Sequence, residues 1–450
     1  TTRLPRLVGV EAALDIILNG RRVEAAEAAA LRLVDEVAPK GTLLDRALAL
    51  AGRVAHAFPR RTRDLPVPPP PPDLAARIEA DLRRTARGRK APQAAFDCVL
   101  RAAAMPFDQA LRAEREAFMT LVGGGEARAL RHMFFAEREA QKFEELTKGT
   151  TMRAIRRVGV VGFGTMGAGI AMAFANAGYP VMVTDATQDA VDRGLEKVRS
   201  TYDDAVRRGR LTAAEGATRT ERVRGSSDFS MLSDADLVVE AVFEDMEVKQ
   251  QVFRRLDETC GERAILATNT STLDVNRLAE ETKDPSRVLG LHFFSPANVM
   301  KLVEVVRPAT VSPNVLASCL DVVKRIGKLG VVVGVCDGFV GNRMLYAYRR
   351  QADFLLEEGA TPAQIDGALR EFGFAMGPFQ VSDLAGLDIS WRVRQRQAAT
   401  RPKHLRYSPI ADRLCEKGRL GQKTGAGWYR YEKGSRTAVP DPEVEALIRE

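Results

Sequence analysis

Long hydrophobic runs are missing from this 450-residue sequence. No stretch of about 18 uncharged apolar residues occurs, which is roughly the length that a membrane-spanning helix needs. The first residues, TTRLPRLVG, also lack the apolar core of a signal peptide. These two absences predict a soluble intracellular protein.

Cysteines are few and scattered. The chain has five, an odd number, and none of them belongs to a C-x-x-C pair. This pattern argues against a disulfide framework and against a structural zinc site, so we expect reduced thiols and no bound metal. The five positions are Cys98, Cys260, Cys319, Cys336 and Cys415.

Aromatic residues make up only 6% of the chain, and they are not interleaved with basic residues as in surfaces that bind nucleic acid. The net charge of +8 allows two interpretations. It suits an anionic ligand such as a phosphorylated carrier, or it reflects an ordinary solvated surface rich in arginine. We favour the solvated surface.

The length and the 45% content of hydrophobic residues predict about three globular domains.

The most informative stretch is residues 158–185. A short apolar run at 158–161 predicts a buried parallel strand, and Gly162, Gly164 and Gly167 follow it as G-x-G-x-x-G at the start of a helix. The first glycine permits a tight turn, the second permits close approach of a pyrophosphate, and the third permits close packing of helix and strand. The pyrophosphate would lie on the positive N-terminus of the helix.

An acidic residue completes this dinucleotide motif. Asp185 follows a second extended segment and lies 23 positions after Gly162, where an acid can bind the ribose hydroxyls. That arrangement favours NAD over NADP. Flavin nucleotides share the fingerprint, so the motif by itself leaves FAD open.

Further alternation of helix and strand predicts an α/β domain of the Rossmann type. The segment ADLVVEAV at 235–242 is expected to be a buried strand, and the apolar run at 263–268 ends in Asn269, Thr270 and Ser271. Ligands bind at the carboxyl ends of parallel strands, so these small polar residues are candidates for the site.

His292 and Glu304 each lie within an apolar run, 12 positions apart. A buried histidine and a buried glutamate both need partners. One interpretation is that they satisfy each other as core residues. The other is that Glu304 orients His292 and stabilises its charged form, which makes His292 a general base. The pattern alone does not choose between them.

The first third of the chain shows helical periodicity in residues 1–55, which is too short to form a core alone. Five consecutive prolines at 68–72 predict an extended segment, which we interpret as a spacer rather than a recognition motif. An apolar helical stripe runs through residues 107–148, and three glycines at 123–125 should interrupt that helix. We expect residues 100–150 to form a helical arm.

From about residue 153 to 432 the chain resembles the L-3-hydroxyacyl-CoA dehydrogenase family, and in particular the dehydrogenase part of multifunctional enoyl-CoA hydratase/3-hydroxyacyl-CoA dehydrogenases of fatty acid β-oxidation. The resemblance is carried by motifs in matching order: GFGTMG, Asp185, AVFEDMEVK, ATNTS, LHFFSP, MKLVEV and DGFVGNR. It implies NAD as cofactor and disfavours flavin. It also implies an acyl-CoA substrate.

The resemblance assigns roles residue by residue. His292 matches the catalytic base and Glu304 its carboxylate partner, while Ser271 and Asn342 match residues that hold the substrate. The positions matching NAD contacts are Met166, Asp185, Glu244, Lys249 and Ser271. Ser295 stands where many members have asparagine, so it is left out of the site. No lysine in the 190–210 helix is an unambiguous counterpart of the family's CoA-contacting lysine.

The same resemblance implies a division into segments. Residues 1–65 look like the end of a hydratase/isomerase (crotonase-like) domain without its catalytic glutamates, so no hydratase activity is expected. The segments that follow are a proline-rich linker (66–99), a helical connecting arm (100–150), the NAD-binding Rossmann domain (151–334) and an all-α C-terminal domain (335–450). Apolar residues at the start of this last domain exceed what one small helical unit usually buries, and they predict an uncovered surface that self-association or a further repeat beyond residue 450 would cover. They are Phe339, Val340, Met344, Leu345, Phe354 and Leu355. The cytoplasm is the expected compartment, or the peroxisome if the source is eukaryotic.

The sequence thus predicts NAD-dependent oxidation of a (3S)-3-hydroxyacyl-CoA to a 3-ketoacyl-CoA. Two alternatives remain beside it. One is a non-catalytic NAD-binding scaffold that docks partners, which the four intact catalytic positions disfavour. The other is a dehydrogenase for a small free hydroxy acid.

Overall fold

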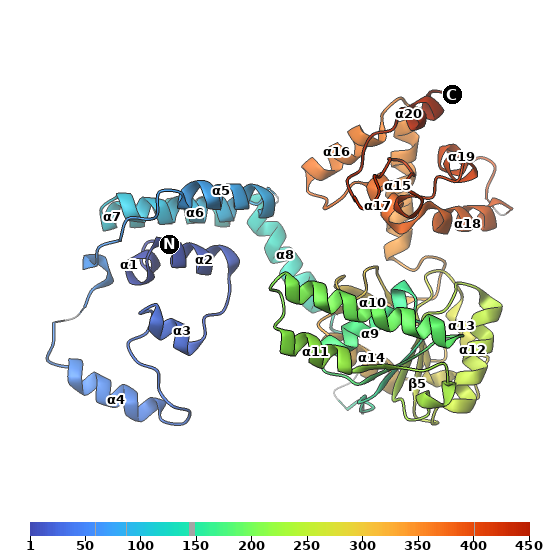
Figure 1. The fold of residues 1–450 in the computed structure, drawn as a ribbon, viewed down its shortest axis with the longest axis horizontal. Coiled ribbons are helices and arrows are strands. Elements are labelled where there is room, and N and C mark those ends of the chain that lie inside the picture. The colour runs from blue at the N-terminus through green and yellow to red at the C-terminus, as the bar shows by residue number, and fades with distance from the viewer. Residues whose placement is uncertain (59, 87, 144–148, 400) are drawn as a thin grey trace. The chain divides into compact units, whose positions relative to one another are not determined.

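The computed structural model describes residues 1–58, 60–86, 88–143, 149–399 and 401–450. The end of the predicted arm, residues 144–148, lies outside this part. The chain divides into two compact units, which are residues 1–134 with 371–375, and residues 135–370 with 376–450. Figure 1 labels the elements of both units. Among the described residues, no helix is both long enough and apolar enough to cross a membrane.

The first unit is helical. Its elements are α1 (Leu4–Val8), α2 (Val10–Asn19), α3 (Ala25–Ala30), α4 (Leu43–Val54), η1 (Thr62–Asp64), α5 (Leu74–Thr85), α6 (Lys90–Ala104), α7 (Phe107–Gly123) and most of α8 (Gly125–Glu139). Helix α7 ends and α8 begins within the glycine triplet at 123–125, as predicted from the sequence.

The segment predicted as a linker contains more structure than expected. The five prolines lie outside helices, but α5 and most of α6 follow within residues 66–99. Their apolar side chains form a small core with α2, so describing all of 66–99 as a linker is wrong. The physical reason is that α2 needs a partner to bury its apolar face. The core residues are Val10, Leu14, Leu74, Leu82, Phe96 and Val99.

The second unit contains an eight-stranded sheet in the order β3-β2-β1-β4-β5-β6-β7-β8. All neighbouring strands are parallel except β6 and β7, which are antiparallel. This confirms the predicted Rossmann-type α/β domain. The strands are β1 (Val158–Val161), β2 (Val181–Thr184), β3 (Val223–Gly225), β4 (Leu237–Glu240), β5 (Ile265–Thr268), β6 (Val288–Phe293), β7 (Leu302–Arg307) and β8 (Leu329–Gly334).

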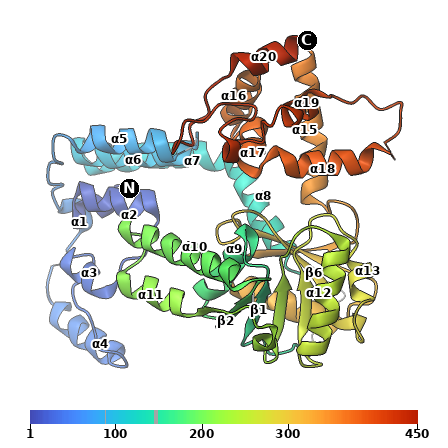
Figure 2. The same ribbon diagram turned by 45° about the vertical axis from the view of Figure 1, so that its right-hand side comes forward.

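Helices cover both faces of the sheet, as Figure 2 shows. On one face α9 (Thr165–Asn176), α10 (Gln188–Arg207) and α14 (Pro313–Arg325) bury apolar residues against the strands. On the other face α12 (Met246–Thr259) and α13 (Val275–Ala279) do the same. The remaining elements are α11 (Ala213–Glu221), η2 (Phe229–Leu232) and η3 (Pro285–Arg287). The strand order reverses between β1 and β4, and a ligand crevice forms at such a point in α/β sheets.

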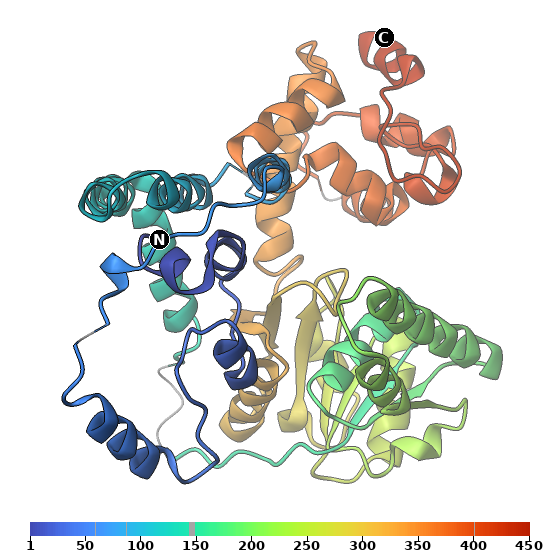
Figure 3. The ribbon, with the colours of Figure 1, turned by 60° about the vertical axis from the view of Figure 1, so that its left-hand side comes forward.

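The C-terminal part is all-helical, as predicted, and is drawn in orange and red in Figure 3. Its elements are α15 (Gly341–Glu357), α16 (Pro362–Phe372), α17 (Pro378–Ala385), α18 (Leu387–Ala398), α19 (Ile410–Glu416), η4 (Gln422–Thr424) and α20 (Pro442–Arg449). Phe339, which the sequence placed on an uncovered apolar surface, is fully buried. Val340, Met344 and Leu355 from the same group are exposed.

Two buried aspartates attach the segment 427–431 to this helical core. Asp383 accepts hydrogen bonds from the backbone N–H of Trp428 (2.9 Å) and Tyr429 (3.0 Å) and from the Tyr431 hydroxyl (2.9 Å). Asp366 accepts the Tyr429 hydroxyl at 2.8 Å. Burial raises the pKa of Asp383 to about 6, although its three donors act in the opposite direction.

Replacing Asp383 by alanine should destabilise the helical domain by about 3 kcal/mol or more, because three buried donors would lose their acceptor. Urea unfolding followed by tryptophan fluorescence measures this directly, since both tryptophans, Trp391 and Trp428, lie in this domain. The exposed control Asp203→Ala should change the stability by less than about 0.5 kcal/mol. Equal unfolding midpoints for Asp383→Ala and the wild type would contradict the anchoring role.

Candidate functional site

The turn after β1 has the backbone that its glycines predict. Gly162 adopts φ +86°, and a Cβ there would lie 2.7 Å from the carbonyl oxygen of Ala241. A Cβ on Gly167 would lie 1.8 Å from the carbonyl oxygen of Gly162, so this position also excludes a side chain. Gly164 differs, because a Cβ there would meet no atom within 4 Å. The space next to Gly164 is open to a ligand.

The N-terminus of α9 fits a phosphate group. Gly164 is the N-cap residue and supplies no side-chain hydrogen bond to the first turn. The first N–H groups of a helix have no partner within the helix, and they carry a partial positive charge. Met166 lies in this turn and packs, half-buried, against the core of the sheet.

Asp185 follows β2 and is held against the glycine turn. Its Oδ2 accepts a hydrogen bond from the N–H of Phe163 at 2.7 Å, and its Oδ1 accepts from the N–H of Ala186 at 2.7 Å. The residues after it are Ala186 and Thr187, so no arginine follows directly to bind a ribose phosphate. The glycine turn and the acid are therefore one connected structure that fits a dinucleotide without a 2′-phosphate.

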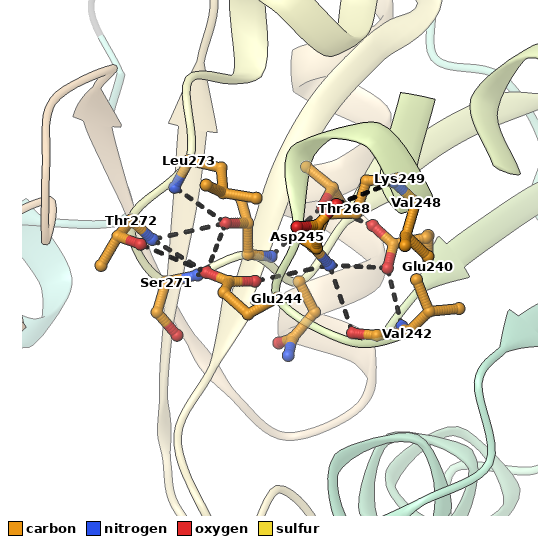
Figure 4. A network of polar contacts seen from close by, with 12 residues as sticks. Glu240, Val242, Glu244, Asp245, Val248, Lys249, Thr268, Ser271, Thr272 and Leu273 are labelled. Atoms are coloured by element: carbon orange, nitrogen blue, oxygen red, sulfur yellow. Dashed lines mark hydrogen bonds and ion pairs between the residues drawn. The ribbon is translucent and has the colours of Figure 1, made fainter. Parts of the chain in front are cut away.

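Glu244 gathers the loop after β5. Its Oε1 accepts hydrogen bonds from the Thr270 hydroxyl (2.7 Å), the Ser271 N–H (2.8 Å) and the Thr272 N–H (3.2 Å). Figure 4 shows these contacts converging on one carboxylate. The structure thus brings together Glu244 and Ser271, two of the residues predicted from the sequence.

Lys249, also predicted from the sequence, is almost completely buried, with 1% of its surface exposed. Its Nζ lies 2.7 Å from Oε1 of Glu240 and 3.5 Å from Oε2 of Glu244, and it donates to the carbonyl of Val242 at 3.4 Å. The ammonium group is therefore surrounded by protein acceptors. Its contact with the loop of Ser271 is indirect, because it pairs with Glu244, and Glu244 in turn binds the loop.

Glu240 is the residue of this network that sequence analysis missed. It ends β4, is fully buried, and also accepts hydrogen bonds from the Thr268 hydroxyl and the Val242 N–H, both at 2.7 Å. The available signal was a glutamate at the end of an otherwise apolar strand, with a lysine nine positions later. A buried carboxylate needs such a cation.

His292 and Glu304 face each other across β6 and β7. The antiparallel register pairs the two residues directly, and His292 Nδ1 lies 2.7 Å from Glu304 Oε2. Both are buried, with 4% and 1% of their surfaces exposed. The His292 ring also packs between Phe294 and Phe339, whose ring centroids lie 4.6 and 5.6 Å away.

The second oxygen of Glu304 binds the start of α15. Oε1 accepts hydrogen bonds from the N–H groups of Val340 (3.0 Å) and Gly341 (2.8 Å). The turn before them places Phe339 at φ +45°, a left-handed conformation that is strained for a phenylalanine. Asn342 follows Gly341 in the first turn of α15, so its backbone is placed by the same contacts.

These contacts keep Glu304 ionised. Burial by itself raises its pKa, but the hydrogen bonds from His292, Gly341 and Val340 outweigh burial, and the pKa of Glu304 is lowered. A carboxylate on Nδ1 favours the tautomer with its proton on that nitrogen. The other ring nitrogen, Nε2, is then the one that can accept a proton from a substrate.

Asn269, a candidate from the sequence, has a structural partner. Its side-chain oxygen accepts the N–H of Phe293 at 2.8 Å, which ties the end of β5 to β6 beside His292.

Within the described ranges, no three histidine, cysteine, aspartate or glutamate side chains gather as a metal site would require.

Comparison with known families gives three matches along the chain. Residues 157–336 match the model for the NAD binding domain of 3-hydroxyacyl-CoA dehydrogenase, and residues 338–431 match its C-terminal domain. Residues 1–66 match the enoyl-CoA hydratase/isomerase family.

Relatives and solved structures agree with these matches. The peroxisomal bifunctional enzyme of Cavia porcellus is 43% identical over all of this chain, which spans 64% of that relative's length. The (S)-3-hydroxybutyryl-CoA dehydrogenase of Ralstonia eutropha is 36% identical with a TM-score of 0.57, and the match covers 62% of this chain and 100% of that one. The dehydrogenase part of multifunctional enzyme 1 from C. elegans is 31% identical with a TM-score of 0.54, over 70% and 73% of the two chains. The chain therefore belongs to the 3-hydroxyacyl-CoA dehydrogenase family of NAD-dependent oxidoreductases.

Proposed function

We propose that this chain oxidises (3S)-3-hydroxyacyl-CoA to 3-ketoacyl-CoA in fatty acid β-oxidation, with NAD as the hydride acceptor. The observation that carries the proposal is the buried His292–Glu304 pair at 2.7 Å. His292 lies near the end of β6. Through β5 and β4, this strand runs in the same direction as β1, the strand that leads to the glycine turn. A proton acceptor and a dinucleotide turn at the same edge of a parallel sheet suit hydride transfer from an alcohol.

His292 would take the hydroxyl proton of the substrate on Nε2, while Glu304 stabilises the imidazolium that forms. Bound NAD would supply the chemistry of accepting the hydride from C3. Gly162, Gly164, Gly167, Met166 and Asp185 would hold the cofactor at the turn.

Ser271 and Asn342 would orient the reacting group. Glu244 and the start of α15 fix their backbones, which reduces the freedom lost when substrate binds. Glu244 and Lys249 would act mainly by holding the loop of Ser271 beside the cofactor.

We also propose domains at 151–334 and 335–450, with residues 1–65 as part of a hydratase/isomerase domain. The family matches support the division, since they cover 157–336, 338–431 and 1–66. The family resemblance places the hydratase glutamates outside residues 1–65, so we propose that these residues do not hydrate enoyl-CoA. The exposed side chains of Val340 and Met344 support self-association of the helical domain.

The cytoplasm is the proposed compartment, or the peroxisome of a eukaryote, as in the names of several relatives.

Removing the base should abolish most of the turnover. His292→Ala is expected to lower kcat on acetoacetyl-CoA by at least ~10², the usual contribution of a positioned acid-base group, while NADH still binds. NADH absorbance measures the rate, and NADH fluorescence measures binding. The exposed His132→Ala serves as the matched control and should keep wild-type activity. Near-normal turnover by His292→Ala would refute this mechanism.

Asp185 should make the enzyme selective for NAD. A carboxylate there repels a 2′-phosphate, so kcat/KM for NADPH is expected to be at least ~10-fold below that for NADH. Asp185→Ser should bring the kcat/KM values for NADH and NADPH closer together, because it weakens the binding of NADH. If the wild type used the two cofactors equally well, the role of Asp185 would be wrong.

The Glu240–Lys249 pair allows stability and cofactor binding to be separated. Glu240→Gln alone leaves the buried lysine with only the more distant, partly exposed carboxylate of Glu244 and should cost about 3 kcal/mol. The double variant Glu240→Gln/Lys249→Met should recover most of that stability, since it removes both charges. Because Glu244 then lacks its cation, KM for NADH should remain roughly 10-fold high while kcat changes less. A double variant with normal KM would show that the pair only supports folding.

A further inference from the structure

A pocket of about 460 Å³ that several arginines line lies within the C-terminal helices. Two helix faces line it, because the contributing residues of α15 and α18 follow the spacing of one helical face. These residues are Tyr346, Arg349, Arg350 and Asp353 from α15, and Ser390, Val393, Arg394 and Gln397 from α18. The apolar core of the domain uses other positions of α15, including Ala352 and Leu356. The pocket adjoins this core at Ala411, which belongs to both.

The segment after α18 closes the pocket with two further arginines. Arg401 stacks on the ring of Tyr407, with 3.5 Å between its guanidinium carbon and the ring centroid. Arg406 is neutralised by Glu357 and Glu358, each about 2.9 Å away. These contacts form one wall of the pocket, and Nη2 of Arg349 and Nη2 of Arg394 are buried behind it.

Unsatisfied polar atoms are concentrated in this pocket. In the described part of the chain, eight buried side-chain nitrogen or oxygen atoms have no hydrogen-bond partner. Four of them belong to residues that line the pocket: Nη2 of Arg349, Nη2 of Arg394, Oγ of Ser408 and Oδ1 of Asp353. A buried polar group without a partner is costly and calls for a water, an ion or a ligand. Three of the four atoms can donate hydrogen bonds.

The charges of the pocket favour an anion. Arg394 keeps one donor unused, because its Nε binds Asp412 at 2.7 Å while Nη2 has no hydrogen-bond partner. Asp353 follows Arg349 by one turn on α15, and burial raises the pKa of Asp353 to about 6. Burial also lowers the pKa of Arg349. An anion in the pocket would supply the acceptor that each Nη2 group lacks and would offset the loss of hydration of the two guanidinium groups.

We propose that this pocket binds a small oxyanion, a phosphate or a carboxylate group, through Nη2 of Arg349, Nη2 of Arg394 and the hydroxyl of Ser408. Neither His292 nor any residue of the glycine turn lines this pocket. Guanidinium groups match the oxygens of both anions in geometry, and the hydroxyl supplies a further donor.

Equilibrium dialysis of the full chain tests the proposal. The protein is saturated with NADH so that the glycine turn is filled, and ionic strength is held constant with chloride. One arm uses radiolabelled inorganic phosphate and the other uses radiolabelled malonate. Saturable binding of one equivalent in either arm is expected, and the arm that binds identifies the type of oxyanion. No saturable binding in both arms would overturn the proposal and leave a water-filled pocket.

Variants then locate the bound anion. Arg349→Met removes a charged donor, and Ser408→Ala removes a neutral donor with little change in volume. Each should weaken binding, Arg349→Met by at least ~10-fold because a charge-assisted contact is lost. Arg199→Met, on the exposed face of α10, is the matched control and should bind as the wild type does. Wild-type affinity in both Arg349→Met and Ser408→Ala would place the anion elsewhere and overturn the assignment.

Discussion

The carboxylate of Glu304 is the interaction on which the dehydrogenase unit depends. One oxygen holds His292 and the other holds the N–H groups of Val340 and Gly341. A single buried charge therefore connects the sheet, the proposed base and the first turn of α15. The same donors keep its pKa low despite burial, so the carboxylate remains available to orient the histidine. The strained φ of Phe339 persists because the surrounding contacts hold it.

The reversal of strand direction at β7 makes this contact possible. His292 and Glu304 are only 12 positions apart, and an antiparallel pair joined by a short connection can place such residues directly opposite each other. A parallel partner strand would need a long crossover first, which would move the glutamate out of register. The change from parallel to antiparallel pairing therefore sets the geometry of the site as well as the order of the sheet.

The buried pairs Glu240–Lys249 and His292–Glu304 differ in which polar atoms they leave free. The ammonium of Lys249 is surrounded by Glu240, Glu244 and the carbonyl of Val242, so it has no donor to spare for chemistry. His292 uses one ring nitrogen for Glu304 and keeps the other. The first pair is suited to holding a loop in place, and the second is suited to moving a proton.

The proline segment shows where local reasoning stops. Consecutive prolines predict an extended chain, and residues 68–72 indeed lie outside helices. The helices that follow were overlooked, although Leu74, Ile78 and Leu82 already stand at helical spacing. Their packing partner, α2, lies more than fifty residues earlier, so only the folded chain shows that α2, α5 and α6 share a core.

The sequence by itself determined the dinucleotide turn, the strand before it, the helix after it and the acid at Asp185. These features are local, because glycine conformation and helix termini act within a few residues. It also determined which residues were candidates for the site. Tertiary structure decided the contacts that the sequence left open: Glu304 with the start of α15, Glu244 with the loop of Ser271, and Glu240 with Lys249 by burial. Such contacts depend on strand order and on the burial of both partners away from water, and neither is encoded in any short stretch of the chain.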